Sequence, residues 1–235
     1  MGTNGRFFWT AIAVVVGATG LLACSEPEPA DSAPWDSPPS DSAAFDSPLG
    51  VVASAVVGGE MVNACQWPSA IHVNSCSATL IHPRVVVTAA HCLSGTTGRV
   101  LFGNSSSAPG AFTLTGACRA GARGSAGGGT RNDWGYCVIP EDDRVKKIPI
   151  TPPLVGCEAE KFLKAGATAW VVGYGSTGSN NAGQGVKRQV AVMVNRVTNG
   201  IVDVGDRDHG ACHGDSGGPL YMQVGDDTHN WGWRV

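Results

Sequence analysis

The sequence predicts an all-β fold, on two observations. Short apolar runs recur along residues 56–235, and clusters of Gly, Ser, Pro and Asn, which favour turns, separate them. No long stretch between them has the 3.6-residue apolar period of an amphipathic helix. The runs expected to form strands are 71–73, 78–81, 84–88, 99–102, 111–115, 136–139, 169–172, 186–197 and 220–224.

Residues 1–24 have the features of an export signal. Arg6 gives a weakly positive start, residues 7–23 are largely apolar, and the stretch closes with Leu-Leu-Ala-Cys. That ending resembles a bacterial lipobox, in which the cysteine, here Cys24, receives a lipid. We therefore expect an exported lipoprotein, anchored to the outer membrane or cell surface through Cys24. The alternatives are an ordinary signal peptide, which would give a secreted protein, and an uncleaved anchor, for which the stretch is slightly short.

Residues 25–55 are expected to be a disordered linker that ends in a pro-segment. Glu-Pro-Glu-Pro begins at position 26, and Asp-Ser pairs recur at 31, 36, 41 and 46. An acidic, Pro-rich segment with so few aliphatic residues cannot bury enough apolar surface to offset the entropy of ordering it. The remaining residues, 56–235, suffice for one domain with a sizeable core.

A candidate nucleophile lies in the run 212–219, which reads Cys-His-Gly-Asp-Ser-Gly-Gly-Pro. A serine hydroxyl is a poor nucleophile at neutral pH, so Ser216 would need a base for its proton and donors for the oxyanion. Gly214 can adopt backbone angles closed to other residues, which would let its N–H and that of Ser216 point at one spot. The alternative is a simple turn, since these residues are common turn formers.

The candidate base and its orienting acid lie upstream. Residues 85–92 read Val-Val-Val-Thr-Ala-Ala-His-Cys, which indicates a buried strand that delivers His91 beside a cleft. Asp133 stands at the start of another apolar segment, 134–139, where a carboxylate would be held away from solvent. A lone histidine is more often structural, so the prediction depends on the whole set of motifs.

These motifs, in the order His, Asp, Ser, resemble those of trypsin/chymotrypsin-family serine proteases. A fourth motif, Val-Val-Gly-Gly at 56–59, resembles the mature N-terminus of that family. The resemblance implies two antiparallel six-stranded β-barrels with the active site between them. His91 and Asp133 would come from the first barrel and Ser216 from the second.

The resemblance also implies a mechanism and an activation step. Ser216 would attack a peptide carbonyl while His91 takes its proton, and Asp133 would orient the histidine. Cleavage before Val56 would free an amino group that pairs with buried Asp215 and draws the oxyanion N–H groups into place. Residues 54–55 read Ser-Ala, so an activator that cuts after Arg or Lys is not expected.

Specificity is expected to depend on Gly210 and Ala211. In trypsin-type members an aspartate six residues before the nucleophile pairs with a basic substrate side chain, and Gly210 occupies that position here. A pocket floored by Gly210 and Ala211 has no charge for Lys or Arg. We therefore expect apolar or small substrate side chains in this pocket.

The chain has eight cysteines, and disulfides persist in exported proteins. The resemblance implies that Cys76 and Cys92 form the bridge that fixes the histidine loop. Cys212 matches a family cysteine whose partner follows the nucleophile strand, and no cysteine follows it here. The others allow three pairings, of which we favour Cys118 with Cys137 and Cys65 with Cys157.

No metal or organic cofactor is expected. The alternative of a metal site rests on four neighbouring residues of ligand type, although their spacing is not that of a known zinc site: Asp208, His209, Cys212 and His213. The net charge of −3 and the lack of a basic run argue against nucleic acid as a partner. A monomer that acts on proteins or peptides is expected.

Two functions remain open from the sequence. The retained His, Asp and Ser favour an exported, membrane-tethered serine endopeptidase. The sequence ends at residues 231–235, which resemble the entry to the strand after the nucleophile strand. The second barrel is therefore expected to be incomplete, without the substrate-pairing strand, the closing strand and the terminal helix of the family. That expectation favours the alternative, a catalytically weak or inactive lipoprotein that acts as a binding module.

Overall fold

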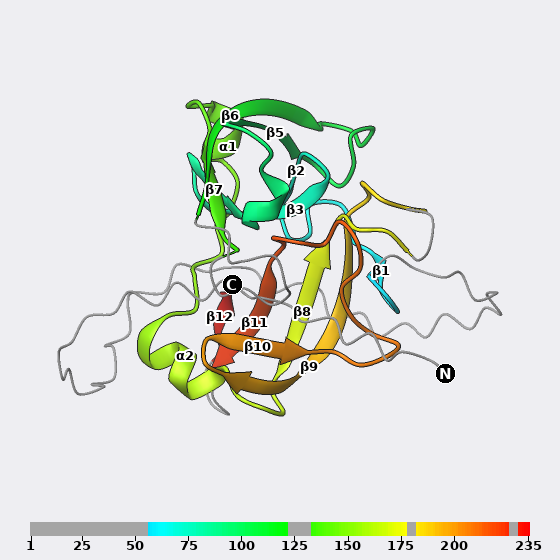
Figure 1. Ribbon diagram of the computed structural model, residues 1–235, viewed down its shortest axis with the longest axis vertical. Coiled ribbons are helices and arrows are strands. Elements are labelled where there is room, and N and C mark those ends of the chain that lie inside the picture. The colour runs from blue at the N-terminus through cyan, green and yellow to red at the C-terminus, as the bar shows by residue number, and fades with distance from the viewer. Residues whose placement is uncertain (1–55, 122–132, 178–181, 226–229) are drawn as a thin grey trace. The chain divides into compact units, whose positions relative to one another are not determined.

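The computed structural model describes residues 56–121, 133–177, 182–225 and 230–235 (Figure 1). The expected export signal at 1–24, with Cys24, and the expected linker at 25–55 lie outside these ranges. Within them, no helix is long and apolar enough to cross a bilayer.

The first half of the domain is a closed antiparallel barrel with the strand order β2-β3-β4-β7-β6-β5. Its strands are rich in β-branched residues, which pack well on a pleated surface. In order they are β2 (Ala70–Val73), β3 (Cys76–His82), β4 (Val85–Thr88), β5 (Thr97–Phe102), β6 (Phe112–Ala120) and β7 (Gly135–Val138). Because the sheet closes on itself, none of these six strands leaves an unpaired edge.

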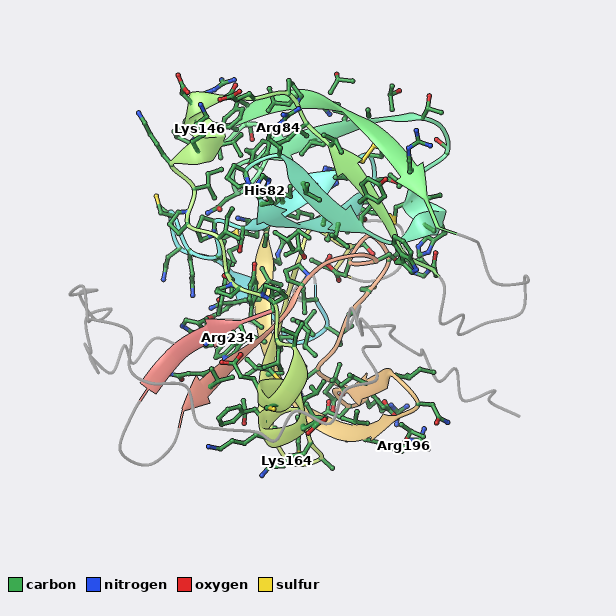
Figure 2. The ribbon with its side chains drawn as sticks, turned by 90° about the vertical axis from the view of Figure 1, so that its left-hand side faces the viewer. His82, Arg84, Lys146, Lys164, Arg196 and Arg234 are labelled. Carbon is green, nitrogen blue, oxygen red and sulfur yellow. A yellow bond between two sulfur atoms is a disulfide. The ribbon has the colours of Figure 1, made fainter. Side chains whose placement is uncertain are left out.

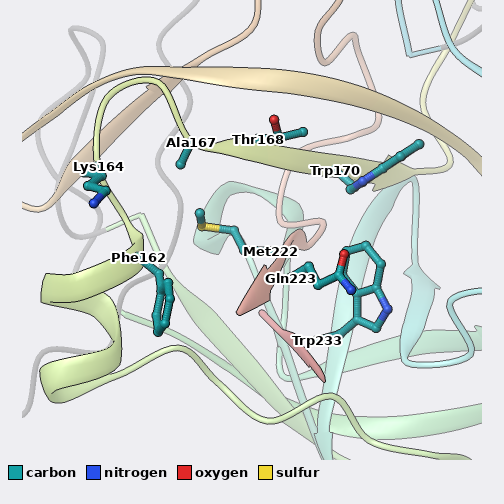
Figure 3. A pocket seen from close by; sticks show the side chains of 8 residues that line it. All are labelled: Phe162, Lys164, Ala167, Thr168, Trp170, Met222, Gln223 and Trp233. Carbon is teal, nitrogen blue, oxygen red and sulfur yellow. The ribbon is translucent and has the colours of Figure 1, made fainter. Parts of the chain in front are cut away.

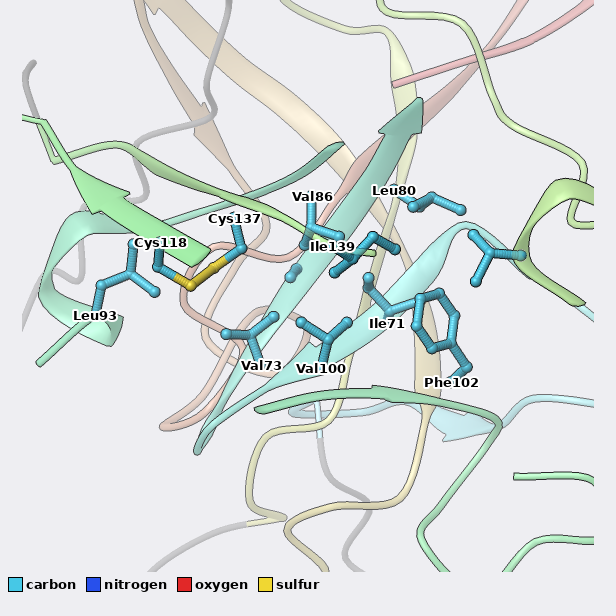
Figure 4. Packing of buried hydrophobic residues seen from close by; sticks show 12 residues of the cluster. Ile71, Val73, Leu80, Val86, Leu93, Val100, Phe102, Cys118, Cys137 and Ile139 are labelled. Carbon is cyan, nitrogen blue, oxygen red and sulfur yellow. A yellow bond between two sulfur atoms is a disulfide. The ribbon is translucent and has the colours of Figure 1, made fainter. Parts of the chain in front are cut away.

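The interior of this barrel is filled by apolar side chains from all around it (Figure 4). Val86 of β4, Val100 of β5 and Ile139 after β7 are fully buried there. At one end Phe102 stacks on Phe112, with ring centroids 4.7 Å apart. The barrel is thus a packed core that gives a rigid support for the segments at its rim.

The disulfide Cys118–Cys137 joins two neighbouring strands on the inner side of the barrel, which confirms that expected pairing. The two cysteines lie directly opposite each other on β6 and β7, with Cα atoms 4.0 Å apart. Glycine is required beside them, because a Cβ at Gly98 would lie 2.7 Å from Cys118 Sγ. A Cβ at Gly116 would lie 3.0 Å from the Cβ of Cys137.

The second half is an open six-stranded sheet with the order β1-β9-β8-β11-β12, in which β10 pairs with β9. Its pairings are all antiparallel. The strands are β1 (Glu60–Met61), β8 (Thr168–Gly173), β9 (Arg188–Thr198), β10 (Ile201–Val204), β11 (Leu220–Gly225) and β12 (Asn230–Arg234). A closed barrel beside a half-barrel confirms the predicted all-β, two-barrel fold class.

Two short α-helices lie between β7 and β8. In α1 (Asp143–Lys146) the carboxylate of Asp142 caps the first turn by accepting from the Arg144 N–H at 2.8 Å. In α2 (Gly156–Phe162) Glu158 accepts two hydrogen bonds of 2.8 Å from Arg234, which ties the helix to β12. The basic side chains labelled in Figure 2 come from several different elements of the domain.

One expected disulfide is wrong. Cys65 lies exposed in the turn between β1 and β2 and has a free thiol, so it does not pair with Cys157. A count of cysteines allows three pairings, but it carries no information on the direction in which a turn projects its side chains. Cys212 also has a free thiol, and its Sγ lies 3.4 Å from Ser176 Oγ.

Candidate active site

Strand pairing brings His91 and Asp133 together. β4 and β7 are antiparallel neighbours, and Thr88 at the end of β4 lies opposite Gly135 at the start of β7. The chain leaves β4 into a short 3-10 helix (Ala90–Cys92) that carries His91, while Asp133 lies just before β7. Residues 42 apart in sequence therefore meet at one rim of the barrel.

Both oxygens of the Asp133 carboxylate bind His91. Oδ1 accepts the backbone N–H of His91 at 2.9 Å, and Oδ2 lies 2.5 Å from the ring Nδ1. Since a carboxylate only accepts, Nδ1 carries the hydrogen of this bond, and Nε2 is left to accept a proton from another group. The histidine side chain is 53% exposed and the aspartate side chain 23%, so the ring faces solvent while its anchor is sheltered.

A disulfide and a hydrogen bond fix the backbone that carries His91. The disulfide Cys76–Cys92, which the resemblance implies, is present and joins the residue after His91 to the start of β3. The buried Thr88 donates its hydroxyl to the Ser77 carbonyl at 2.8 Å. These bonds fix the backbone on both sides of His91.

The loop that carries Ser216 turns tightly around Asp215. The Asp215 side chain points inward, where Oδ1 accepts from the Gly175 N–H at 2.7 Å and Oδ2 from the Cys212 N–H at 2.9 Å. Its own N–H donates to the Cys212 carbonyl at 3.0 Å, and its carbonyl accepts from Gly218 at 2.9 Å. The loop is thereby closed on a fully buried carboxylate.

The peptide between His213 and Gly214 is also held. Its carbonyl accepts a hydrogen bond of 2.7 Å from the Ser176 N–H, so the Gly214 N–H on the same peptide points the opposite way. Gly214 has φ = 94°, a conformation that favours glycine. The Gly214 N–H therefore lies on the side of the loop away from Ser176.

The serine loop packs directly on the histidine segment. A Cβ at Gly217, which has φ = 76°, would lie 2.2 Å from Thr88 Oγ1 and 2.4 Å from the Ala89 nitrogen. Ser216, half-buried, is thus brought to the strand that delivers His91. Between these two described residues there is no hydrogen bond, and such bonds are often long before a substrate binds.

Burial has the largest effect on the pKa of the Asp215 carboxyl group. It raises the pKa of Asp215 from 3.8 to about 6, against the opposing effects of the two N–H donors and of Arg188. Among the described residues, no ion pair neutralises this carboxylate. The loop therefore contains an anion that lacks a cation in contact with it.

The segment expected to become the N-terminus lies beside this loop. The Val56 side chain is fully buried and packs in the apolar core of the second sheet. Val57 pairs with Gly210, whose N–H donates to the Val57 carbonyl at 3.1 Å. Gly58 must be glycine, because a Cβ there would lie 2.4 Å from the Asp208 carbonyl oxygen.

Comparison with known families gives a direct match. Residues 56–232 match the family model described as Trypsin, and that range is most of the chain. The chain belongs to the trypsin family. Membership gives it a serine-protease-like function and makes proteins the expected class of substrate.

Surface hollows of this trypsin-family chain lie away from His91, Asp133 and Ser216. One, of about 340 Å³, lies between the end of α2 and strands β8, β11 and β12, with Phe162, Trp170 and Trp233 around it (Figure 3). Another, of about 310 Å³, lies over β9 and the turn that contains Asp206 and His209. Neither hollow includes a predicted catalytic residue among the described side chains that line it.

The described residues do not support the alternative metal site. They contain one grouping of three possible ligands, Cys76, His91 and Cys92, and its two cysteines are joined in a disulfide. His209 instead contacts the carboxylate of Asp206, with Nδ1 and Oδ1 3.0 Å apart. The four residues proposed as ligands do not converge on a common point.

Gly210 and Ala211, the expected pocket floor, are both partly exposed. Apart from the adjacent residues, the nearest neighbour of a Cβ at Gly210 would be the Asp206 carbonyl oxygen, 3.9 Å away, so the position has room for a side chain. Sequence reasoning missed Ser77 and Ser176, which bind the backbone of the serine loop. Neither belongs to a motif, and only their three-dimensional placement reveals the contact.

Proposed function

We propose that this trypsin-family chain is a serine endopeptidase in which Ser216 is the nucleophile, His91 the general base and Asp133 the orienting carboxylate. The observation that supports it most is the double hydrogen bond from His91 to Asp133, at 2.9 Å from the backbone N–H and 2.5 Å from Nδ1. This arrangement sets the ring orientation and the tautomer that a base for Ser216 requires.

The reaction would proceed in two halves. Ser216 Oγ bonds to the carbonyl carbon while His91 Nε2 takes its proton, and the C–N bond then breaks as His91 returns that proton to the leaving amine. His91 next takes a proton from a water that attacks the acyl carbon, and the ester bond to Ser216 Oγ then breaks as His91 returns the proton to Oγ and the acid leaves. The N–H groups of Gly214 and Ser216 would bind the oxyanion, which is worth about 3 kcal/mol per donor.

We further propose that cleavage before Val56 activates the enzyme. Asp215 is a buried anion that no cation among the described residues contacts, and the Val56 side chain already lies in the adjacent core. Val56 also has φ = 55°, which costs a β-branched residue on the order of 1–2 kcal/mol. Hydrolysis of the preceding peptide bond would remove that constraint and supply an ammonium group for Asp215.

The pocket at Gly210 and Ala211 would select apolar or small substrate side chains. The expected result with a peptide library varied at the residue before the scissile bond is cleavage after such residues and not after Arg or Lys. Gly210→Asp should introduce cleavage after Arg and Lys, because the site has room for the carboxylate. Gly210→Asn, of the same shape but neutral, is the control. Preferred cleavage after Arg by the unmodified enzyme would contradict the assignment.

For localisation, we propose an exported lipoprotein tethered through Cys24 by the segment 25–55, working as a monomer. Metabolic labelling with a radioactive fatty acid should mark the full chain and not its Cys24→Ser variant. Equal labelling of the two chains, or none, would contradict the lipid anchor.

Hydrolysis itself tests the proposed function. The full chain would be made with Asp-Asp-Asp-Asp-Lys in place of residues 51–55, so that enteropeptidase cuts before Val56. The cut chain should digest casein, while Ser216→Ala and His91→Ala chains, cut in the same way, should not. A folded, cut chain without hydrolysis would favour the alternative of a non-catalytic binding protein.

A further inference from the structure

Ser77 of the first barrel contacts the serine loop, residues 212–219. It follows Cys76 on β3 and is fully buried. Its hydroxyl donates to the Gly214 carbonyl at 2.9 Å and accepts from the Tyr174 N–H at 2.8 Å. One buried hydroxyl therefore joins the first barrel to the serine loop and to the residue that follows β8.

Glycines next to Ser77 leave room for its side chain. A Cβ at Gly173 would lie 3.0 Å from Ser77 Oγ, and a Cβ at Gly218 would lie 2.9 Å from the Ser77 Cβ. The Ser77 carbonyl also accepts the Thr88 hydroxyl at 2.8 Å, so the same residue is tied to the histidine strand. Ser77 thus has bonded contacts to both segments that must meet for the reaction.

The bond to Gly214 bears directly on the oxyanion donor. Gly214 has no side chain to restrict it and adopts φ = 94°. The carbonyl before it is held by the Ser176 N–H at 2.7 Å, and its own carbonyl is held by Ser77 at 2.9 Å. With the peptides on both sides of Gly214 bound, the direction of its N–H is fixed.

We propose that Ser77 is a positioning residue for the oxyanion hole: its hydroxyl holds the Gly214 carbonyl, which fixes the backbone angles of this glycine and keeps its N–H in the direction that stabilises the transition state. The inference rests on the proposed function, because it assigns Ser77 a part in that reaction. A preorganised donor acts through its placement, so loss of the hydroxyl should lower kcat more than it changes KM.

Ser69 provides a matched control. It is also a fully buried serine of the first barrel region, and its hydroxyl contacts Tyr221 at 2.8 Å and Thr151 at 3.2 Å. Neither of these partners belongs to the loop 212–219. Replacing either serine by alanine therefore removes an equally buried hydroxyl, but only the hydroxyl of Ser77 is bonded to the serine loop.

The test uses the full chain cut before Val56. Ser77→Ala should lower kcat by about tenfold or more with KM changed by less than about twofold, and Ser69→Ala should leave kcat within about twofold. Ser77→Ala should also weaken binding of a peptide boronate, which mimics the tetrahedral oxyanion, by a factor close to its loss in kcat. Urea unfolding of both variants measures the purely structural cost.

A second pair keeps the inference testable if Ser77→Ala folds poorly. Ser77→Thr and Ser77→Val have the same shape, and only threonine retains the hydroxyl, so threonine should keep at least about tenfold more kcat. Equal kcat in this pair, or equal losses in Ser77→Ala and Ser69→Ala, would reduce Ser77 to a structural residue. An unmodified cut chain that does not react with a fluorophosphonate would overturn both the inference and the proposed function.

Discussion

The ionisation of Asp215 gives the sharpest test of the activation proposal. Its carboxylate is fully buried in the uncut chain, and burial raises its pKa from 3.8 to about 6. Since one pKa unit corresponds to about 1.4 kcal/mol, the ionised carboxylate costs the folded, uncut chain about 3 kcal/mol at neutral pH.

The sign of the pH dependence follows from proton binding. Between pH 3.8 and about 6 the folded chain keeps a proton on Asp215 that the unfolded chain has released. The contribution of this group to stability is therefore fully present below pH 3.8 and is lost as the pH rises through about 6. The uncut chain should accordingly lose stability through Asp215 between about pH 4 and 7.

Asp215→Asn should stabilise the uncut chain and destabilise the chain cut before Val56. In the uncut chain at pH 7 the substitution removes the buried charge, but the amide nitrogen of the new asparagine would face an N–H donor. We therefore expect the free energy of unfolding to rise by a net amount of about 1–2 kcal/mol. At pH 4 the gain should vanish. In the chain cut before Val56, the same change would leave an unpaired buried ammonium group and should cost about 3 kcal/mol or more.

Urea unfolding at pH 4 and pH 7, with Ser216→Ala in every sample to prevent self-digestion, measures these differences. Comparison of Asp215→Asn with its parent at each pH cancels the contribution of the other titrating groups. Stabilisation of the cut form, or the same sign in both forms, would refute the ion pair between Val56 and Asp215.

Three further predictions concern other parts of the domain. Gly217→Ala should lower kcat by at least about 100-fold by forcing the serine loop away from Thr88, whereas Gly200→Ala, with φ = 75° but open space around it, should leave kcat unchanged. Asp133→Asn should lower kcat by about 10⁴-fold without unfolding the chain, as circular dichroism would check. Burial lowers the pKa of Lys187 from 10.5 to about 7, which costs the folded chain about 4 kcal/mol at pH 7, so stability should rise with pH between those values. Lys187→Met removes this cost but also the hydrogen bond from Nζ to the Trp67 carbonyl at 2.9 Å, so it should add about 2 kcal/mol at pH 7 in urea unfolding. Unchanged stability in Lys187→Met would contradict that cost.

Much of the fold could be predicted from local patterns. The predicted runs at 84–88 and 220–224 correspond to β4 and β11, because β-branched and other apolar residues favour strands wherever they lie in the sheet. β10 was missed although a signal was present. Asn199 and Gly200 have φ values of 54° and 75° and form the tight hairpin turn between β9 and β10, and Asn-Gly is a strong predictor of such a turn.

The contacts of the site were less accessible to sequence reasoning. His91 and Asp133 could be proposed because motifs mark them, and the structure places them in hydrogen-bond contact. Cys65 could not be assigned, because its exposed position depends on how the turn after β1 leaves the sheet. Ser77 could not be recognised because its hydroxyl binds a backbone carbonyl 137 residues away, and no local pattern records such a contact.

The central claim is that Ser216 is a nucleophile activated by His91 and Asp133. Its most direct test is reaction of the chain cut before Val56 with a fluorophosphonate probe, with the modified residue located by tandem mass spectrometry. The account predicts stoichiometric labelling at Ser216, much slower labelling in the uncut chain, and none in the His91→Ala chain. A folded, cut chain that remains unlabelled, or is labelled at another residue, would contradict it.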